Sequence, residues 1–173
     1  MLFRSGDPTW AISVALVENG RPIMAALFAP ACRELFLAVA GQGATLNDAP
    51  IAASAPARLA GARLAGPKNM LRGLSDLGLE VIMEPRVPSL ALRIARVAQG
   101  RYEAAFASSN SHDWDLAAAD LLVHEAGGAV TAFTGQRLIY NKLEPVHGAV
   151  IAAGRACHQT LIELMRHRRA ELA

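Results

Sequence analysis

Short apolar runs separated by turn residues fill the first third of the chain. One such turn is Asn19-Gly20, and Asn-Gly between two apolar runs is a strong hairpin signal because both residues tolerate positive φ. Breaks at residues 30–33 and 41–43 divide the later runs. The pattern predicts a meander of four antiparallel strands, at residues 10–17, 22–28, 34–39 and 44–46.

Beyond residue 60 the periodicity changes, and short strands alternate with helices. The predicted strands cover residues 63–65, 80–83, 102–106, 129–133, 137–140 and 149–153, and the predicted helices 69–77, 90–99, 114–125 and 158–168. Ser89 is the expected N-cap of the second helix. The third helix is apolar on nearly every side, so we expect it to lie between two layers.

These elements predict a layered α/β fold with two sheets. The 173 residues suffice for one domain with a real core. We therefore expect a single domain over 1–173, with the antiparallel strands in about 8–50 and the alternating β/α part in about 60–173.

Composition and charge narrow the class of protein. With 53% hydrophobic and 18% charged residues, the chain is typical of an ordered globular protein. No apolar stretch approaches the ~20 residues that span a bilayer, and the first residues carry no signal-peptide core, so we expect a cytoplasmic protein without a membrane partner. The net charge of +2 and the scattered basic residues argue against a nucleic-acid partner. Cys32 and Cys157 match no disulfide or metal-ligand spacing.

The segment 108–128 carries the most chemistry. Asp113 and Asp115 stand directly before a buried helix, where Asp113 could cap backbone amides and the positive end of the helix dipole favours both carboxylates. Two capping acids are the plain structural interpretation. The alternative interpretation, that one of the two binds a metal, depends on the wider context.

That context resembles the inositol monophosphatase family. Trp114-Asp115-Leu-Ala-Ala, followed one helix later by Glu125-Ala-Gly-Gly128, is similar to the family's C-terminal signature. Residues 6–16 resemble its first long strand, 41–47 its Gly-x-Gly-Ala turn, and 89–100 its central helix. The resemblance implies a sugar-phosphatase-like α/β/α/β/α sandwich whose N-terminal part is missing, so that this chain corresponds to the C-terminal two thirds. It also implies that apolar surface or a sheet edge is left exposed.

In that family two or three Mg²⁺ ions bridge the phosphate and activate the attacking water, and the resemblance makes Asp115 one metal ligand. The family's other ligands lie in a Gly-Glu-Glu segment and an Asp-Pro-x-Asp-Gly-Thr loop, and neither sequence occurs here. Asp7-Pro8 is not followed by Asp-Gly-Thr and is not expected to bind metal. Because Mg²⁺ demands several oxygen ligands, Asp115 alone should bind it weakly.

Candidate substrate-binding residues follow from the same resemblance. Ser108 and Asn110 occupy the loop where the family often places an acidic residue for a sugar hydroxyl, which leaves room for a 3′-phosphoadenosine nucleotide, as in the bacterial 3′(2′),5′-bisphosphate nucleotidase branch. His112 could contact the leaving group or merely bond backbone. Lys68 could face phosphate, although a solvated turn is the plainer interpretation. The residues give no catalytic base, and His124, His147, His158 and His167 show no ligand spacing.

Two functions remain open. The first is a Mg²⁺-dependent phosphomonoesterase for a small phosphorylated metabolite, for which the family resemblance also allows a homodimer. The second is a catalytically silent fragment or binding module that keeps the phosphatase scaffold; an upstream Asp-Pro-x-Asp-Gly-Thr coding run would instead indicate a misplaced start. A dinucleotide-binding enzyme is set aside because no Gly-x-Gly-x-x-Gly follows a predicted strand.

Overall fold

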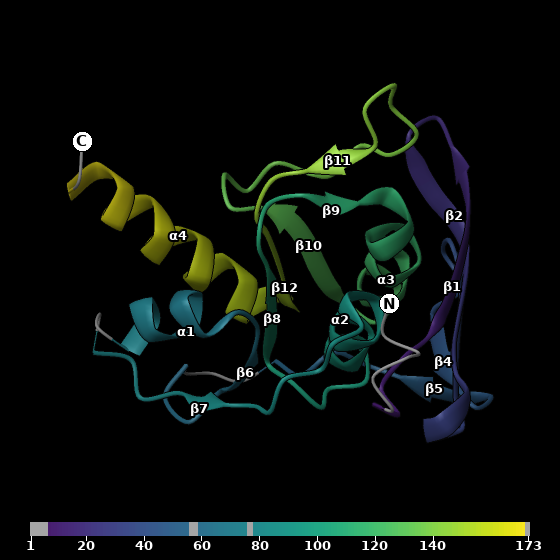
Figure 1. Ribbon diagram of the computed structural model, residues 1–173, viewed down its shortest axis with the longest axis horizontal. Coiled ribbons are helices and arrows are strands. Elements are labelled where there is room, and N and C mark those ends of the chain that lie inside the picture. The colour runs from purple at the N-terminus through teal and green to yellow at the C-terminus, as the bar shows by residue number, and fades with distance from the viewer. Residues whose placement is uncertain (1–6, 56–58, 76–77, 172–173) are drawn as a thin grey trace.

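The fold is a stack of four layers. The computed structural model describes residues 7–55, 59–75 and 78–171. An antiparallel sheet, here sheet A, forms one outer layer; helices α2 and α3 lie behind it; a mixed sheet, sheet B, follows; and α1 and α4 cover its far side (Figure 1). The predicted layered α/β architecture is therefore confirmed, without a helical layer on the outside of sheet A in the described part of the chain.

Sheet A is a meander in the strand order β1-β2-β3-β4-β5. Its strands are β1 (Ile12–Glu18), β2 (Arg21–Ala29), β3 (Glu34–Val39), β4 (Ala44–Leu46) and β5 (Ala49–Ile51). The predicted hairpin is confirmed, because Asn19 and Gly20 have φ of 48° and 76° and Glu18 pairs with Arg21. The fifth strand was not predicted; Asn47 and Asp48, both at positive φ, turn the chain into it.

Sheet B has the order β10-β12-β8-β6-β7. Its strands are β6 (Arg63–Ala65), β7 (Ile82–Met83), β8 (Ala104–Ala107), β10 (Gly128–Ala132) and β12 (Val150–Gly154). A separate pair joins β9 (Ser111–His112) to β11 (Val146–His147). The strand predicted at residues 137–140 is wrong: only an isolated bridge between Thr131 and Arg137 forms there. Tyr140 instead bonds back to Gly20 of the β1–β2 hairpin, and this long-range contact draws the segment out of the sheet.

Four helices are described: α1 (Lys68–Ser75), α2 (Leu90–Ala98), α3 (Asp113–Glu125) and α4 (Arg155–Glu171). The predicted N-cap of α2 is confirmed, because the Ser89 hydroxyl accepts a hydrogen bond from the Leu92 amide at 3.3 Å. Every residue of α3 from Leu116 to Val123 is buried, as expected for a helix between two layers. None of these helices is both long and apolar enough to cross a membrane.

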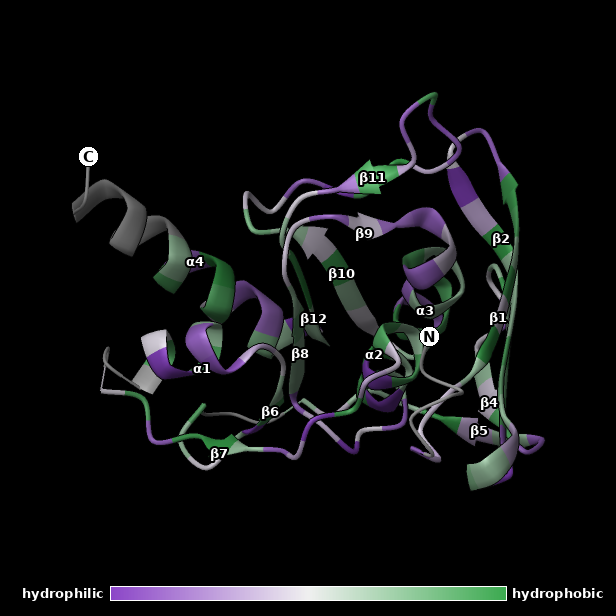
Figure 2. Ribbon diagram, in the orientation of Figure 1, coloured by the Kyte–Doolittle hydropathy of each residue, from purple (hydrophilic) through white to green (hydrophobic). Residues whose placement is uncertain are grey.

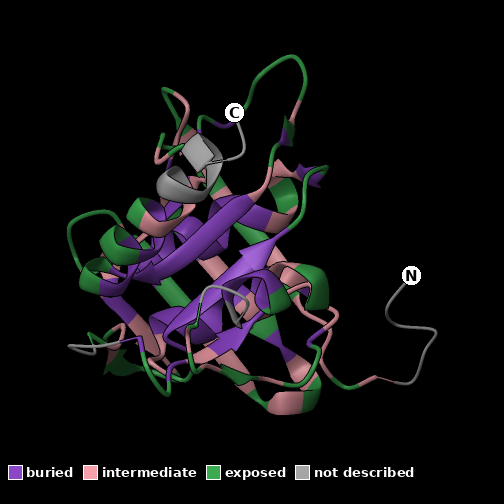
Figure 3. Cartoon of the chain, turned by 90° about the vertical axis from the view of Figure 1, so that its left-hand side faces the viewer, coloured by how far each residue is buried: buried purple, intermediate pink, exposed green. Residues whose placement is uncertain are grey.

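Two apolar cores follow from the alternation of side chains along sheet B. Ala105 and Ala107 face α2 and α3 in the larger core, whereas Ala104 and Phe106 face α1 and α4 in the smaller one. Figure 3 shows this buried centre behind the exposed helix surfaces. The larger core packs α3 against both sheets, and this packing positions the residues of its first turn.

Candidate functional site

Asp115 lies in the first turn of α3, at the wall of an open cavity. The cavity has a volume of about 390 Å³, and Asp115 lines it together with Ala11 and Ser13 of the opening segment and Ser89 at the start of α2. The strand before the hairpin therefore reaches the predicted ligand. The Asp115 side chain is partly exposed, so its carboxylate can meet a solute that enters the cavity.

Asp113, two residues earlier, does not cap the helix as predicted. The N-cap position belongs to His112, and no side chain caps the helix there. The Asp113 carboxylate instead accepts a hydrogen bond from the Asn141 amide at 2.6 Å and contacts His147 Nε2 at 2.6 Å. These partners lie far away in the sequence, so the capping prediction is wrong because tertiary contacts occupy the Asp113 carboxylate. Asp113 joins the start of α3 to the segment 141–147.

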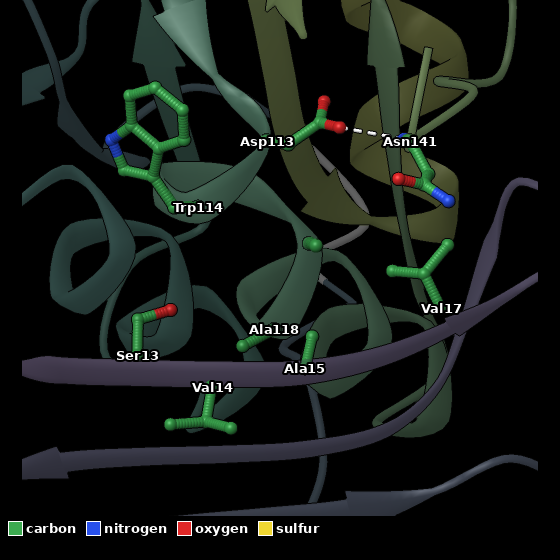
Figure 4. Close-up of a pocket in the computed structure, with 9 residues that line it drawn as sticks. Ser13, Val14, Ala15, Val17, Asp113, Trp114, Ala118 and Asn141 are labelled. Atoms are coloured by element: carbon green, nitrogen blue, oxygen red, sulfur yellow. Dashed lines mark hydrogen bonds between the residues drawn. The ribbon is translucent and has the colours of Figure 1, made fainter.

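A second cavity of about 520 Å³ lies on the other side of Trp114. Figure 4 shows it between the β1 residues Ser13, Ala15 and Val17 and the start of α3, with Asn141 at one end. The Trp114 indole is 61% exposed and stacks on His112, with ring centroids 4.3 Å apart. Trp114 and Ser13 line both cavities, so the two together form one recess along the first turn of α3.

The predicted substrate residues of the loop before α3 are neighbours of Asp113 and Trp114 in the sequence, but they do not line the recess. Ser108 and Asn110 are exposed, and the Asn110 amide bonds to the His147 carbonyl at 3.0 Å. His112 is the N-cap residue of α3, and its ring stacks on the Trp114 indole. The structure thus places none of these three residues among those that line the recess, and their contact with a substrate stays a prediction.

Lys68 lies elsewhere. It opens α1 and lines a different cavity of about 500 Å³, together with Gly66, Arg72 and Arg86. Helix α1 belongs to the layer on the far side of sheet B from α3 (Figure 1). The structure does not bring Lys68 and Asp115 into one cavity; Lys68 and the two arginines line their own cavity together with the acidic Glu84.

Two of the sequence motifs meet directly. The Glu125 carboxylate, at the end of α3, accepts hydrogen bonds from the Gly41 and Gly43 amides at 2.9 and 2.8 Å. The Gly-x-Gly turn of sheet A and the Glu-Ala-Gly-Gly end of α3 are therefore one structural unit. Glu125 fixes the far end of the helix that presents Asp115, and it has no place in the recess itself.

A buried ionic cluster lies in the middle of α3, and sequence reasoning missed it. Asp120 accepts a hydrogen bond from the Tyr140 hydroxyl at 2.9 Å and pairs with Arg21 at 3.1 Å. Burial raises the pKa of the Asp120 carboxyl, although Arg21 and the Tyr140 hydroxyl oppose that rise. Burial, together with the nearby Asp120, also raises the pKa of Tyr140. The sequence signal that could have predicted this cluster is a single aspartate within an apolar helix, together with an arginine in the Asn-Gly hairpin.

The described residues do not form a magnesium cage by themselves. Within residues 7–55, 59–75 and 78–171, no group of three or more His, Cys, Asp or Glu side chains comes together. Mg²⁺ needs octahedral oxygen ligation, usually from one or two carboxylates together with substrate phosphate and water. Asp115 supplies one carboxylate, and the cavity adds only hydroxyls such as that of Ser13. The described donors therefore do not fit a two-metal centre.

Known proteins resemble this chain in sequence and in fold. Residues 2–170 match the inositol monophosphatase family. The "Nus factor SuhB" of Xylella fastidiosa is 40% identical over 139 residues, covering 75% of this chain and 50% of that protein. The "Inositol-1-monophosphatase" of Mesorhizobium japonicum is 30% identical, covering 95% and 63%. The solved inositol monophosphatase of Anabaena (Nostoc) sp. PCC 7120 aligns with a TM-score of 0.81 at 30% identity, covering 95% of this chain and 70% of that one.

The match covers nearly all of this chain but only part of its relatives. The chain spans about half of the Xylella protein and less than two thirds of the Mesorhizobium protein. The resemblance inferred from Trp114-Asp115 and Glu125–Gly128 is confirmed by the match over residues 2–170. The chain belongs to the inositol monophosphatase family.

Proposed function

We propose that this chain forms part of a magnesium-dependent phosphomonoesterase that hydrolyses a small phosphorylated metabolite, with Asp115 as one metal ligand. The observation that carries this proposal is the position of Asp115 on the first turn of a buried helix, at a cavity that Ser13 and Ser89 also line. Carboxylates at a helix start stay ionised readily, because the helix dipole favours negative charge there. An ionised carboxylate is the kind of ligand that Mg²⁺ takes.

The substrate class follows from the recess rather than from the metal. In the larger cavity Trp114 offers an exposed ring, Asn141, Ser13 and Asp113 offer polar groups, and the remaining walls are alanine and valine. Such a lining suits a phosphorylated sugar, cyclitol or nucleoside, whose hydroxyls and rings can use both kinds of contact. Ser108, Asn110 and His112 would meet the substrate only if the loop moves toward the recess.

The direct test measures phosphate release from a panel of phosphomonoesters, including inositol phosphate and a 3′-phosphoadenosine nucleotide, with and without added Mg²⁺. Asp115→Asn is compared with Glu144→Gln, which neutralises an exposed carboxylate outside both cavities. Release that needs Mg²⁺ and is lost only in Asp115→Asn supports the proposal. Unchanged activity in Asp115→Asn refutes the role of Asp115.

A second function is a catalytically silent binding module on the phosphatase scaffold. It is favoured by the finding that no group of three or more His, Cys, Asp or Glu side chains able to hold a metal forms among the described residues, and the 40% identical relative carries the name Nus factor rather than phosphatase. Calorimetric titration of Mg²⁺ into the chain separates the two functions. Binding at more than one site counts against the silent module, whereas a folded chain with no Mg²⁺ binding and no phosphate release supports it.

A further inference from the structure

A cavity of about 500 Å³ lies at the start of α1, and it shares no lining residue with the recess at Asp115. It lies where two parallel strands end, because Gly66 follows β6 and Glu84 follows β7. The Glu84 amide donates a hydrogen bond to the Leu64 carbonyl at 2.9 Å, which holds the two strand ends side by side. Figure 1 shows α1, β6 and β7 together at the end of the molecule away from sheet A. In α/β sheets, ligands bind in the crevice outside the carboxyl ends of parallel strands.

Four charged side chains line this cavity, here called the cation cavity: Lys68 and Arg72 of α1, and Glu84 and Arg86 after β7. In the part of the chain that the structure describes, none of the four is in an ion pair. Asp7, whose charge also reaches Arg86, does not line the cavity. Three cations therefore share the cavity with one carboxylate, which leaves it with a net positive charge.

The start of α1 adds to this positive charge. A helix N-terminus carries a partial positive charge, so acidic residues are favoured there and lysine is not. The first turn of α1 nevertheless begins with Lys68 and contains no acidic residue. Figure 2 shows hydrophilic residues along α1 beside the hydrophobic β7. An anion in the cation cavity would offset the repulsion between Lys68 and the helix dipole.

Arg93, on α2, increases the positive potential around Arg86. Burial, together with the charge of Arg86, lowers the pKa of Arg93 to about 10. The Arg93 Nε is buried without a hydrogen-bond partner among the described residues, and no described carboxylate forms an ion pair with this guanidinium. Two like charges disfavour each other's charged form, and an anion bound at Arg86 would offset that cost.

We propose that the cation cavity binds the phosphate group of a small hydroxylated metabolite, at a site separate from the recess at Asp115. Lys68, Arg72 and Arg86 supply the cations, and a guanidinium suits phosphate because it can donate two parallel hydrogen bonds. A phosphate monoester carries a charge of about −1.5 to −2 at pH 7. That charge matches the excess of the three cations over the Glu84 carboxylate.

The rest of the lining favours an organic phosphate over the inorganic ion. The Glu84 carboxylate repels a further anion but can accept hydrogen bonds from hydroxyl groups. Leu71, Met83 and Pro85 provide apolar surface for a carbon skeleton. The volume lies within the ~300–1,000 Å³ of small-molecule sites. A sugar phosphate would use the cations, the carboxylate and the apolar wall together.

Isothermal titration calorimetry of the whole chain in EDTA tests the site, with glucose 6-phosphate and inorganic phosphate as probes. EDTA removes the Mg²⁺ that the proposed phosphomonoesterase needs at Asp115, so a negative result here leaves that function untouched. Arg72→Gln/Arg86→Gln should weaken the binding of both probes at least about tenfold, because charge-assisted hydrogen bonds are lost. Arg33→Gln/Arg137→Gln is the matched control, since it removes two exposed arginines that do not line the cavity. The control should change the affinity by less than about twofold, because distant exposed charges are screened by salt.

Glu84→Gln separates a specific site from general surface charge. This variant should bind inorganic phosphate more tightly, because a like charge is gone. Its preference for glucose 6-phosphate over inorganic phosphate should fall about threefold, because hydrogen bonds to a charged acceptor are stronger than those to a neutral one. The proposal is overturned if neither probe binds the unaltered chain saturably. It is equally overturned if the two arginine pairs weaken binding alike, because phosphate would then respond to net charge alone.

Discussion

The Asp113 carboxylate holds His147 Nε2 at 2.6 Å, and this contact ties the first turn of α3 to β11. The same carboxylate accepts a hydrogen bond from the backbone amide of Asn141. One side chain therefore fixes the segment that closes the recess around Trp114 against the helix that presents Asp115.

Asp113→Ala should lower the free energy of unfolding by about 1.5–3 kcal/mol, because it removes hydrogen bonds to a charged acceptor. Urea unfolding monitored by circular dichroism measures the change. Glu144→Ala removes an exposed carboxylate from the neighbouring loop and should shift the free energy by less than about 0.5 kcal/mol. Equal effects of the two substitutions would show that the Asp113 contacts add nothing to stability.

The buried cluster around Asp120 predicts an asymmetry between its two charged members. Arg21→Met leaves the Asp120 carboxylate buried with only the Tyr140 hydroxyl as a partner, and should cost about 3–5 kcal/mol. Asp120→Asn should cost less, because the Arg21 side chain is 34% exposed and can turn to water. Urea unfolding of the two variants at neutral pH compares them, and a larger loss in Asp120→Asn would contradict this account.

The loss in Arg21→Met should also depend on pH. Burial already raises the folded-state pKa of Asp120, and removing Arg21 raises it further. A carboxyl with a raised folded-state pKa favours folding below its ordinary value of 3.8, and that contribution disappears as the pH rises through the folded-state pKa. The variant should therefore be closer to the unaltered chain near pH 4 than at pH 8, as urea midpoints at the two pH values will show.

His158, at the start of α4, predicts a weakening of the fold in mild acid. Burial lowers the pKa of His158 from its ordinary 6.5, and its Nε2 lies 2.9 Å from the Thr131 hydroxyl. Below pH 6.5 the His158 side chain binds a proton more readily in the unfolded chain than in the folded chain. The free energy of unfolding is therefore retained above about pH 6.5 and falls as the pH drops toward the folded-state pKa. Urea midpoints between pH 7.5 and 5 should fall less in His158→Gln than in His124→Gln, which replaces an exposed histidine.

Gly154, at the end of β12, predicts a steric requirement. A Cβ at this position would collide with the Ser54 carbonyl, whereas a Cβ at Gly148 would meet nothing within 4 Å. Gly154→Ala should cost about 1–3 kcal/mol through overpacking against backbone, and Gly148→Ala should be neutral or slightly stabilising because it restricts the unfolded chain. Melting temperatures of the two variants test the contrast, which fails if they shift alike.

Most of the local elements, and the place of α3 between two layers, could be predicted from the sequence alone, whereas β5 was missed and the strand at residues 137–140 was wrong. Asn19-Gly20 fixed a hairpin because its backbone angles suit few other residues, Ser89 fixed a helix start, and the apolar surround of α3 required a place between two sheets. Turn conformation and helix capping depend on residues close together in the sequence, so they can be predicted from the sequence. The same holds for the Trp114-Asp115 and Glu125–Gly128 pair, whose spacing is that of one helix.

Which distant residues share a site depends on the tertiary structure and could not be predicted from the sequence. Asp113 contacts His147 instead of capping α3. Tyr140 bonds to Gly20 and Asp120 instead of joining a strand. Lys68 lies on the opposite side of sheet B from Asp115. Each outcome depends on groups at least twenty residues apart or on the side of a sheet that an element covers. Local propensity carries no information about such pairings, because burial and hydrogen bonding across layers, formed only in the folded chain, select among them.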